Sequence, residues 1–495
     1  MPEPPKPDSP PFGIPAAEYE PRLARTYLSD VGDRRHELTL APYHRIILGR
    51  RGSGKTALAA YLRFQKDQPY DAFVSIDQRT AFRRILTEVE RSMDHGRPAL
   101  AEDIIALWIL GFWTAVMTEL HHLGHLDSLA VRHYLRVAQS GGINIPGAGL
   151  LDPLASIVRQ RDSTLLDHDA LVTALDGASY QDAIADAKVC LDRLQCVAIA
   201  IDSLEEAPVQ SQAMVAVAGA LLLAASRSGE VMHEHIHVKC LVPTELWLYL
   251  APKIQGVGKF TPFEIRWSID DLMRLVCIRY NNFLAEFDHV RAVLPGPNPK
   301  SPADVRGRIW DQFFPKKAEG PSGFLEDVQT LMMRHTQLRP RQLIQLCNSI
   351  ASKSELRTFN PNHIRDGIQD CVEALATEVF ASYNHIYRDV EEALQQHLRN
   401  RPAAFDSKSV NAPDAFWDMA YELGVVGPVT GGKKMPVREE SEFQEYLTAD
   451  FDFGGSGTAR WRPRIGEQVA VHPMFHKRLG IREGAQTMIG LSALR

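Results

Sequence analysis

The chain has 495 residues, of which 45% are hydrophobic and 23% are charged. This length exceeds one ordinary hydrophobic core, so we expect about two to four packing units in a globular protein. The formal net charge of −6 excludes a surface covered in positive charge for nucleic-acid binding, although it leaves room for a local basic patch.

The N-terminus, the cysteines and the apolar windows together predict a cytoplasmic protein. Residues 1–20 are rich in proline and lack a positive segment followed by an apolar run, which predicts a disordered leader rather than a secretory signal. The six cysteines form no CxxC pair and no metal-ligand spacing, which favours buried, reduced thiols. The apolar windows Ile104–Met117 and Ala213–Ala225 are too short to span a bilayer, so we expect buried helices and no membrane partner.

A glycine-rich motif follows the first predicted strand. The apolar run Ile46–Leu48 precedes Gly49-Arg50-Arg51-Gly52-Ser53-Gly54-Lys55-Thr56, which fits G-x-x-x-x-G-K-[ST], and a helical pattern continues from Ala57. Backbone N–H groups of such a loop turn toward phosphate oxygens, and the helix N-terminus behind them favours negative charge. We therefore expect residues 49–57 to bind a nucleotide, with Lys55 at the β- and γ-phosphates and Thr56 on Mg²⁺. The alternative is a glycine-rich turn with a chance lysine.

The next segments predict an α/β domain over residues 21–265. Ala72–Asp77 is typical of a short buried strand, and residues 79–194 show a mostly helical pattern that we interpret as an insert. Cys196–Ile201 and Val238–Val242 are apolar runs typical of buried parallel strands. Strands that alternate with helices predict a parallel sheet covered on both faces, the architecture of a P-loop NTPase.

Acidic residues follow the run Cys196–Ile201. A P-loop enzyme needs an acid at the tip of a strand beside the P-loop strand to hold Mg²⁺, and a carboxylate that orients or deprotonates the attacking water. Asp202 suits the first role. Glu205 or Glu206 suits the second, and the sequence leaves that choice open; together with Lys55 they form the predicted catalytic set. A surface acidic turn is the alternative.

Two further positions are candidates for contact with the nucleotide. Thr244 follows the run Val238–Val242, where a polar residue at the strand tip can sense the γ-phosphate, and a helix N-cap is the alternative. Arg341 lies at the start of a predicted helix in a lid domain and would reach the phosphates, with Arg339 as the next candidate.

The C-terminal half divides into two predicted domains. Residues 266–380 show helical patterns, including one over Phe324–Thr336, and predict an α-helical lid domain. Residues 381–495 combine short helices with a glycine-turned hairpin, which suggests a winged-helix-like domain. Its basic stretch, which contains Arg460, Trp461, Arg462 and Arg464, suits contact with DNA, but acids and bases balance from Ser382 onward, so DNA binding is less favoured. The pair His472-Pro473 predicts a structural turn rather than a metal site.

Taken together, these residues resemble bacterial P-loop ATPases of the AAA+/STAND group. The run Asp202-Ser203-Leu204-Glu205-Glu206 is similar to the D-G-h-D-E signature of NACHT-type members, with Ser for Gly and Glu for Asp. Ile265-Arg266-Trp267-Ser268 is similar to the start of the lid domain in this group and in origin-recognition ATPases. Arg339-Pro340-Arg341 resembles their second sensor, and Val471-His472-Pro473-Met474-Phe475 resembles the close of their winged-helix domain.

The resemblance implies an ATP-binding and ATP-hydrolysing switch with ATP and Mg²⁺ as cofactors. Its nucleotide state, ATP or ADP, would control self-assembly into a homo-oligomer or a partner effector protein, in a role such as antiviral defence. The group usually carries a long sensor array after the winged helix, and no such array follows here, so we expect a partner to supply that part. The alternative function is a DNA-binding or DNA-remodelling ATPase that acts through its winged helix.

Overall fold

The chain forms two compact units. The computed structural model describes residues 10–28, 44–64, 71–77, 79–94, 100–139, 168–202, 211–254, 261–287, 309–320, 325–354, 358–384, 386–436, 443–451, 461–482 and 487–492. The α/β unit comprises Arg34–Arg50 and Lys55–Ile265, and the C-terminal unit comprises Met1–Asp33, Arg51–Gly54 and Arg266–Arg495. The boundary after Ile265 coincides with the predicted end of the α/β domain.

A parallel sheet forms the centre of the α/β unit. Its strands are β1 (Ile46–Gly49), β2 (Ala72–Asp77), β3 (Val197–Asp202), β4 (Ile236–Pro243) and β5 (Phe263–Glu264), in the spatial order β2-β3-β4-β1-β5. All four neighbouring pairs are parallel. The near-continuous apolar sequence of β1, β3 and β4 follows from this arrangement, because both faces of the sheet are covered by helices. The predicted α/β class with a parallel sheet is confirmed.

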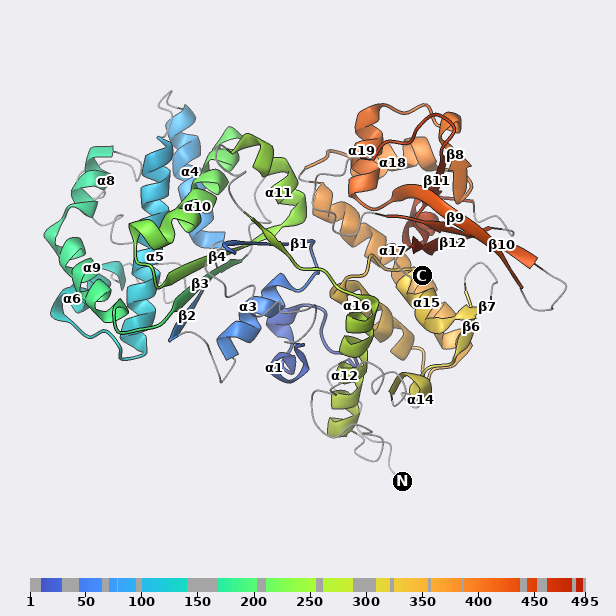
Figure 1. The fold of residues 1–495 in the computed structure, drawn as a ribbon, viewed down its shortest axis with the longest axis horizontal. Helices are drawn as coiled ribbons and strands as arrows, with labels where there is room; N and C mark the ends of the chain where they lie inside the picture. Colours follow the sequence, from blue (N-terminus) through green and yellow to red (C-terminus); the bar gives the residue numbers. More distant parts are fainter. Residues whose placement is uncertain are drawn as a thin grey trace. The chain divides into compact units, whose positions relative to one another are not determined.

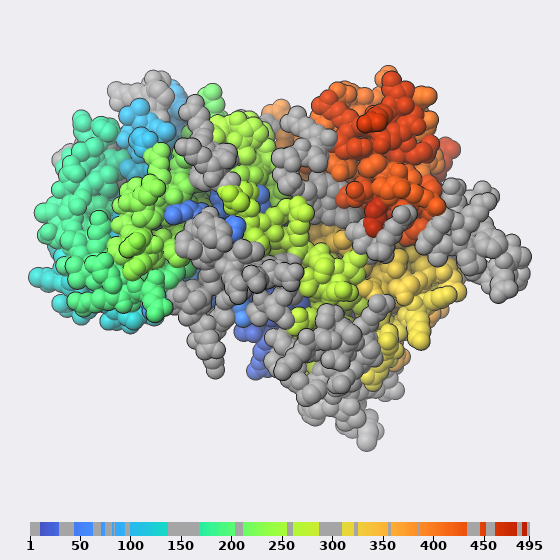
Figure 2. Space-filling model, in the orientation of Figure 1, coloured from blue at the N-terminus to red at the C-terminus, as the bar shows by residue number. Residues whose placement is uncertain are grey.

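Helices fill the connections between the strands (Figure 1). They are α3 (Lys55–Phe64), α4 (Arg79–Asp94), α5 (Ala101–His122), α6 (Leu129–Gln139), α8 (His168–Leu175), α9 (Ala178–Leu191), α10 (Gln212–Val231) and α11 (Thr244–Leu250), with the short η3 (Ala251–Lys253). The helices from α4 to α9 confirm the predicted helical insert. In the space-filling view, the residues coloured cyan to blue-green, which include those of α6, α8 and α9, lie together on the face shown (Figure 2).

The two most apolar helices are core elements of the α/β unit. By length and composition α5 and α10 would suffice to cross a membrane, but 78% and 56% of their most apolar windows are buried inside the protein. The indole N–H of Trp108 on α5 donates to the carbonyl of Val217 on α10 at 3.3 Å, which joins the two helices directly. The prediction of buried helices at these windows is therefore confirmed.

The C-terminal unit is built mainly from helices, followed by a second sheet (Figure 1). Its elements are η1 (Ala17–Tyr19), α1 (Leu23–Thr26), α12 (Ile269–Phe287), α14 (Asp311–Phe313), β6 (Lys317–Glu319), β7 (Leu325–Asp327), α15 (Val328–Met333), α16 (Pro340–Ala351), α17 (Pro361–Tyr383), α18 (Val390–Leu398), β8 (Ala404–Asp406), η6 (Ser407–Ser409), α19 (Asp414–Glu422), β9 (Val426–Pro436), β10 (Phe443–Ala449), β11 (Gln468–Val471), η7 (Pro473–Phe475), α20 (His476–Leu479) and β12 (Thr487–Leu491). The second sheet has the order β12-β10-β9-β11-β8 and is built around the β9–β10 hairpin. The winged-helix character of this last module stays a prediction.

The predicted boundary between residues 380 and 381 is wrong as a division between compact units. It falls inside α17, which packs against α16 on the lid side and against η7 and α20 on the other. One hydrophobic cluster runs from Phe12 to Leu491 through both predicted domains. A helix shared by two segments buries apolar residues against both, so they share one core.

The predicted helix over Phe324–Thr336 is shorter than expected. Its first part, β7, pairs antiparallel with β6, and only Val328–Met333 is helical. The side chain of Asp327 caps this helix by accepting from the amide of Thr330, and a capping aspartate marks a helix start that apolar periodicity alone does not show.

The predicted disordered leader is wrong for residues 10–20, while residues 1–9 lie outside the described part of the chain. Phe12 is completely buried, and its ring stacks on Tyr280 of α12 with centroids 5.0 Å apart. The carboxylate of Glu20 is also buried and lies 3.6 Å from the guanidinium of Arg279. One aromatic and one acidic residue therefore fix a proline-rich segment whose composition suggested disorder.

Replacing Phe12 tests this packing. We expect Phe12→Ala to lower the free energy of unfolding by about 3–5 kcal/mol, because it removes a fully buried ring from a core that cannot close completely around the cavity. Urea denaturation measures the change. Tyr19→Ala is the matched control, since Tyr19 is an aromatic residue of the same segment with 72% of its surface exposed, and we expect a change within about 0.5 kcal/mol. Equal stability of both variants would contradict the observed docking.

Candidate functional site

The glycine-rich motif lies between a strand and a helix, as predicted. β1 ends at Gly49, α3 begins at Lys55, and the loop between them has positive φ angles of 82° at Gly52 and 99° at Gly54. Residues with side chains rarely adopt such angles, so the two glycines meet a real backbone requirement. Successive residues in a conformation of this kind form a concave row of N–H groups that suits an anion.

The motif also lies at a topological switch point of the sheet. The connection after β1 leads to β2 at one edge, whereas the connection after β4 leads to β5 at the opposite edge. β1 and β4 are neighbours, with Gly49 opposite Pro243. In open parallel sheets, ligands bind outside the carboxyl ends of the strands at such a point. The topology thus selects the same edge of the sheet as the motif, on independent grounds.

Lys55 is buried at the start of α3. Its ammonium group donates to the carbonyls of Gly49 at 2.8 Å and Arg50 at 3.3 Å, so it closes the loop on the strand side. Thr56 and Ala57 occupy the first turn of the helix and are half-buried. The lysine and the threonine that the sequence predicts for phosphate and metal therefore sit at the helix N-terminus that follows the loop.

Asp202 is the last residue of β3 and lies at the same carboxyl edge. The expectation that its strand is beside the P-loop strand is wrong, because β4 pairs with both β1 and β3 and separates them. Two strand spacings, about 10 Å, therefore lie between β3 and β1. Asp202 remains half-exposed at this edge. Glu205 and Glu206 lie outside the described residues.

Thr244 follows β4 directly and is only 2% exposed. The expected alternative of a helix N-cap is wrong, because Pro243 occupies the cap position of α11 and the cap has no side-chain hydrogen bond. The Thr244 hydroxyl has no hydrogen-bond partner within the described part of the chain. Buried hydroxyls are normally paired, so an unpaired one beside the motif suits a polar ligand. Glu245 is only 3% exposed and adds a carboxylate at this edge that was not predicted from the sequence.

Within the C-terminal unit, three donors bind three successive carbonyls of the loop. The Arg339 guanidinium donates to Arg51 at 3.2 Å, the Arg341 backbone amide to Gly52 at 3.3 Å, and the Trp267 indole to Ser53 at 2.7 Å. The predicted lid arginines therefore lie beside the loop. A role for Trp267 was not predicted, although it belongs to the segment that resembles the start of a lid domain.

Arg341 contacts the loop through its backbone rather than its charge. Its guanidinium pairs with Glu378 at 3.1 Å, and Gln345 donates to the other oxygen of the same carboxylate. A Cβ on Gly52 would lie 3.0 Å from the Cβ of Arg341, so glycine also permits the close approach of α16. A contact between the Arg341 side chain and phosphate stays a prediction.

His472 forms a structural turn, as predicted. It is fully buried, and its Nδ1 accepts the amide of Met474 at 3.1 Å, which caps η7. Burial lowers the pKa of His472 to about 3, and the positive charges of Arg334 and Arg339 act in the same direction. Burial, together with Arg334, also lowers the pKa of His335 well below its usual value. Both rings are therefore neutral in the folded protein at neutral pH.

The C-terminal basic stretch is occupied by contacts within the protein. The guanidinium of Arg462 pairs with Asp414 and with Asp418, the latter at 2.6 Å, and Trp461 packs against Tyr421. Arg460 lies outside the described residues. These ion pairs neutralise the charge of Arg462, one of the basic residues that a DNA contact would use.

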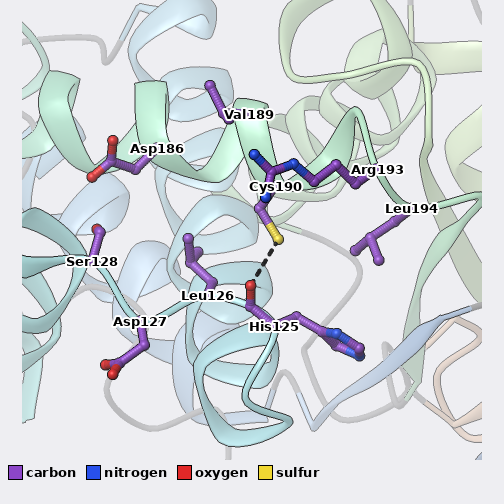
Figure 3. A pocket seen from close by; sticks show the side chains of 9 residues that line it. All are labelled: His125, Leu126, Asp127, Ser128, Asp186, Val189, Cys190, Arg193 and Leu194. Carbon is purple, nitrogen blue, oxygen red and sulfur yellow. Dashed lines mark hydrogen bonds between the residues drawn. The ribbon is translucent and has the colours of Figure 1, made fainter.

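A separate pocket lies among the helices of the insert, at the turn between α5 and α6 and beside α9 (Figure 3). Its volume is about 330 Å³, and Cys190 donates its thiol to the carbonyl of His125 at 3.3 Å. Burial raises the pKa of Cys190, so the thiol remains protonated and is a poor nucleophile. Among the described residues there is also no cluster of three or more His, Cys, Asp or Glu arranged for a metal ion.

Comparison with known proteins adds no assignment to this geometry. No family model, no curated protein and no solved structure matches the chain. The candidate site is therefore interpreted from its own residues and topology.

The buried histidines predict sensitivity to acid. Because the folded state keeps His335 and His472 neutral, only the unfolded chain takes up their protons as the pH falls below about 6.5. Stability is thus lost on acidification, by up to about 1.4 kcal/mol per pH unit for each histidine. Urea denaturation at several pH values between 7 and 5 measures how the free energy of unfolding changes with pH.

The variant His472→Asn isolates one of the two contributions. Asparagine keeps a side-chain oxygen for the cap of η7 but does not titrate. We therefore expect the unfolding free energy of this variant to fall less steeply with decreasing pH, by an amount that corresponds to about one proton fewer taken up on unfolding. His125→Asn is the matched control, because it makes the same substitution at an exposed histidine. Parallel curves for all three proteins would refute the assignment.

Proposed function

We propose that this protein binds ATP with Mg²⁺ and hydrolyses it as a P-loop switch of the AAA+/STAND type. The observation that carries the proposal is the coincidence of two independent features at one place. A G-x-x-x-x-G-K-[ST] loop with the backbone conformation of an anion site follows β1, and β1 and β4 form the switch point of the parallel sheet.

The residues at this edge fit the proposed ligand. The loop amides and Lys55 would hold the phosphates, and Thr56 with Asp202 would hold Mg²⁺, which prefers oxygen ligands. The buried Thr244 hydroxyl offers a polar contact whose partner is otherwise missing from the described residues. Bound Mg²⁺ would neutralise charge on the transferred phosphoryl group, while Glu205 or Glu206 would orient or deprotonate the attacking water.

A switch function follows from the way the loop is shared. Residues Arg51–Gly54 cluster with the C-terminal unit, although they lie within the motif that follows β1. A ligand held by these residues would therefore stabilise their contacts with α16 and with the segment before α12. We propose that this coupling controls self-assembly or a partner effector in the cytoplasm, with antiviral defence as the proposed setting. The alternative of DNA remodelling is less favoured, because the charge of Arg462 is already neutralised by ion pairs within the protein.

Removing the lysine charge tests nucleotide binding. We expect Lys55→Ala to weaken ATP and ADP binding about 10- to 100-fold, because it deletes a charge-assisted contact to phosphate. Isothermal titration calorimetry measures the affinities. Lys188→Ala is the matched control, since Lys188 is an exposed lysine on α9 of the same unit. Failure of the wild-type protein to bind any adenine nucleotide would refute the proposed function.

Removing both glutamates tests the hydrolytic step. We expect the double variant Glu205→Gln with Glu206→Gln to bind ATP normally and to lose turnover by about 100-fold or more, because glutamine cannot accept the proton of the attacking water. Phosphate release and calorimetry separate the two effects. Each single variant then identifies which glutamate acts. Normal turnover in the double variant would exclude both residues from this role.

A further inference from the structure

We propose that Trp267 and Arg339 are positioning residues that orient the phosphate-binding amides of the loop. The proposal rests on the proposed function, because it assumes that the amides of residues 52–54 donate hydrogen bonds to phosphate. It adds that the shape of the anion site is determined by side chains of the C-terminal unit, more than 200 residues away in sequence from the motif.

The hydrogen bonds fix three consecutive peptide groups. The carbonyls of Arg51, Gly52 and Ser53 accept from Arg339, from the amide of Arg341 and from Trp267, respectively. The described chain contains no cis peptide bond. In a trans peptide, the N–H of the following residue points opposite to the carbonyl. The N–H groups of residues 52, 53 and 54 therefore each point away from the donor that binds their peptide group.

This orientation is the one an anion site needs. A peptide group at a glycine rotates easily, because glycine populates positive and negative φ about equally. Without the external donors, the peptide groups around Gly52 and Gly54 would sample orientations in which their amides diverge. Donors on the carbonyl side hold the amides together before a ligand arrives, so less conformational entropy is lost on binding.

The two side-chain donors come from helix N-termini that are themselves well defined. Trp267 precedes α12, where Ser268 and Asp271 form reciprocal hydrogen bonds of 3.1 and 3.3 Å between side chain and backbone. Such a capping box satisfies two backbone amides that have no partner within the helix, so it stabilises the turn that follows Trp267. Arg339 is the N-cap residue of α16 and follows Leu338, which has an unusual φ of 52°. The backbone at the start of each helix therefore positions the donor, in addition to the donor's hydrogen bond to the loop.

The test removes the indole N–H and keeps the ring. We expect Trp267→Phe to weaken ADP and inorganic pyrophosphate binding by a similar factor, about fivefold, which corresponds to one ordinary hydrogen bond. Pyrophosphate carries no base or ribose, so an equal loss for both probes locates the effect at the phosphate-binding amides. Calorimetry measures both affinities on the full chain.

Trp108→Phe is the matched control. Trp108 also donates its indole N–H to a backbone carbonyl, that of Val217, but in the helical core of the α/β unit. The control should bind both probes as the wild type does, even if its stability falls. Arg339→Met provides a second variant, which removes the donor to Arg51 and should weaken pyrophosphate binding as well, should the tryptophan variant fail to fold.

A spectroscopic readout separates positioning from general stabilisation. Phosphate bound to the amides polarises the same peptide groups whose carbonyls accept from Trp267, and linked hydrogen bonds strengthen one another. In protein labelled with 5-fluorotryptophan, the ¹⁹F resonance that is missing from Trp267→Phe should shift on addition of pyrophosphate, whereas the Trp108 resonance should not.

The outcomes distinguish this inference from the proposed function. If the wild-type protein binds neither ADP nor pyrophosphate, the proposed function itself fails. If the wild type binds both and Trp267→Phe and Arg339→Met bind them equally well, the site exists and only the positioning role is refuted. A loss for ADP without a loss for pyrophosphate would also overturn it, because the effect would then lie outside the phosphate-binding amides.

Discussion

The parallel pairing of β1 with β4 is the constraint on which the candidate site depends. It places Gly49 opposite Pro243, so the loop that follows β1 and the buried Thr244 that follows β4 emerge at the same edge. It also makes these two neighbours the strands whose connections lead to opposite edges of the sheet. Ligands bind outside the carboxyl ends of the strands at such a point in open parallel sheets.

The apolar strands and the motif were predictable because their causes are local. A strand buried on both faces must be apolar throughout. The sequence therefore shows short apolar runs at β1, β2, β3 and β4. The predicted bounds of β2 are the observed ones. The order of the strands was not predictable in this way. The place of β4 between β1 and β3 depends on pairing between segments about 40 and 190 residues apart, which periodicity does not encode.

Three of the errors share one physical origin, which is packing between distant segments. Residues 10–20 have a composition typical of disorder, but Phe12 stacks on Tyr280 and Glu20 lies beside Arg279, so two long-range contacts outweigh composition. The predicted boundary at residue 380 failed because α17 buries side chains against both neighbouring segments. The loop contact of Trp267 was missed for the same reason, since a single indole donor leaves no periodic signal.

The chain path gives the loop a double role. Gly49, Arg50 and Lys55 belong to the α/β unit, whereas the four residues between them cluster with the C-terminal unit. The carbonyls of Arg51, Gly52 and Ser53 are bound by donors of that unit, and the amides of the residue after each carbonyl are the groups proposed to bind phosphate. Because one peptide group carries both bonds, a ligand on the amide and a donor on the carbonyl each favour the same orientation. If phosphate binds these amides as proposed, linkage requires that a change in the position of the two helix N-termini changes the phosphate affinity, and that bound phosphate opposes that change by the same free energy.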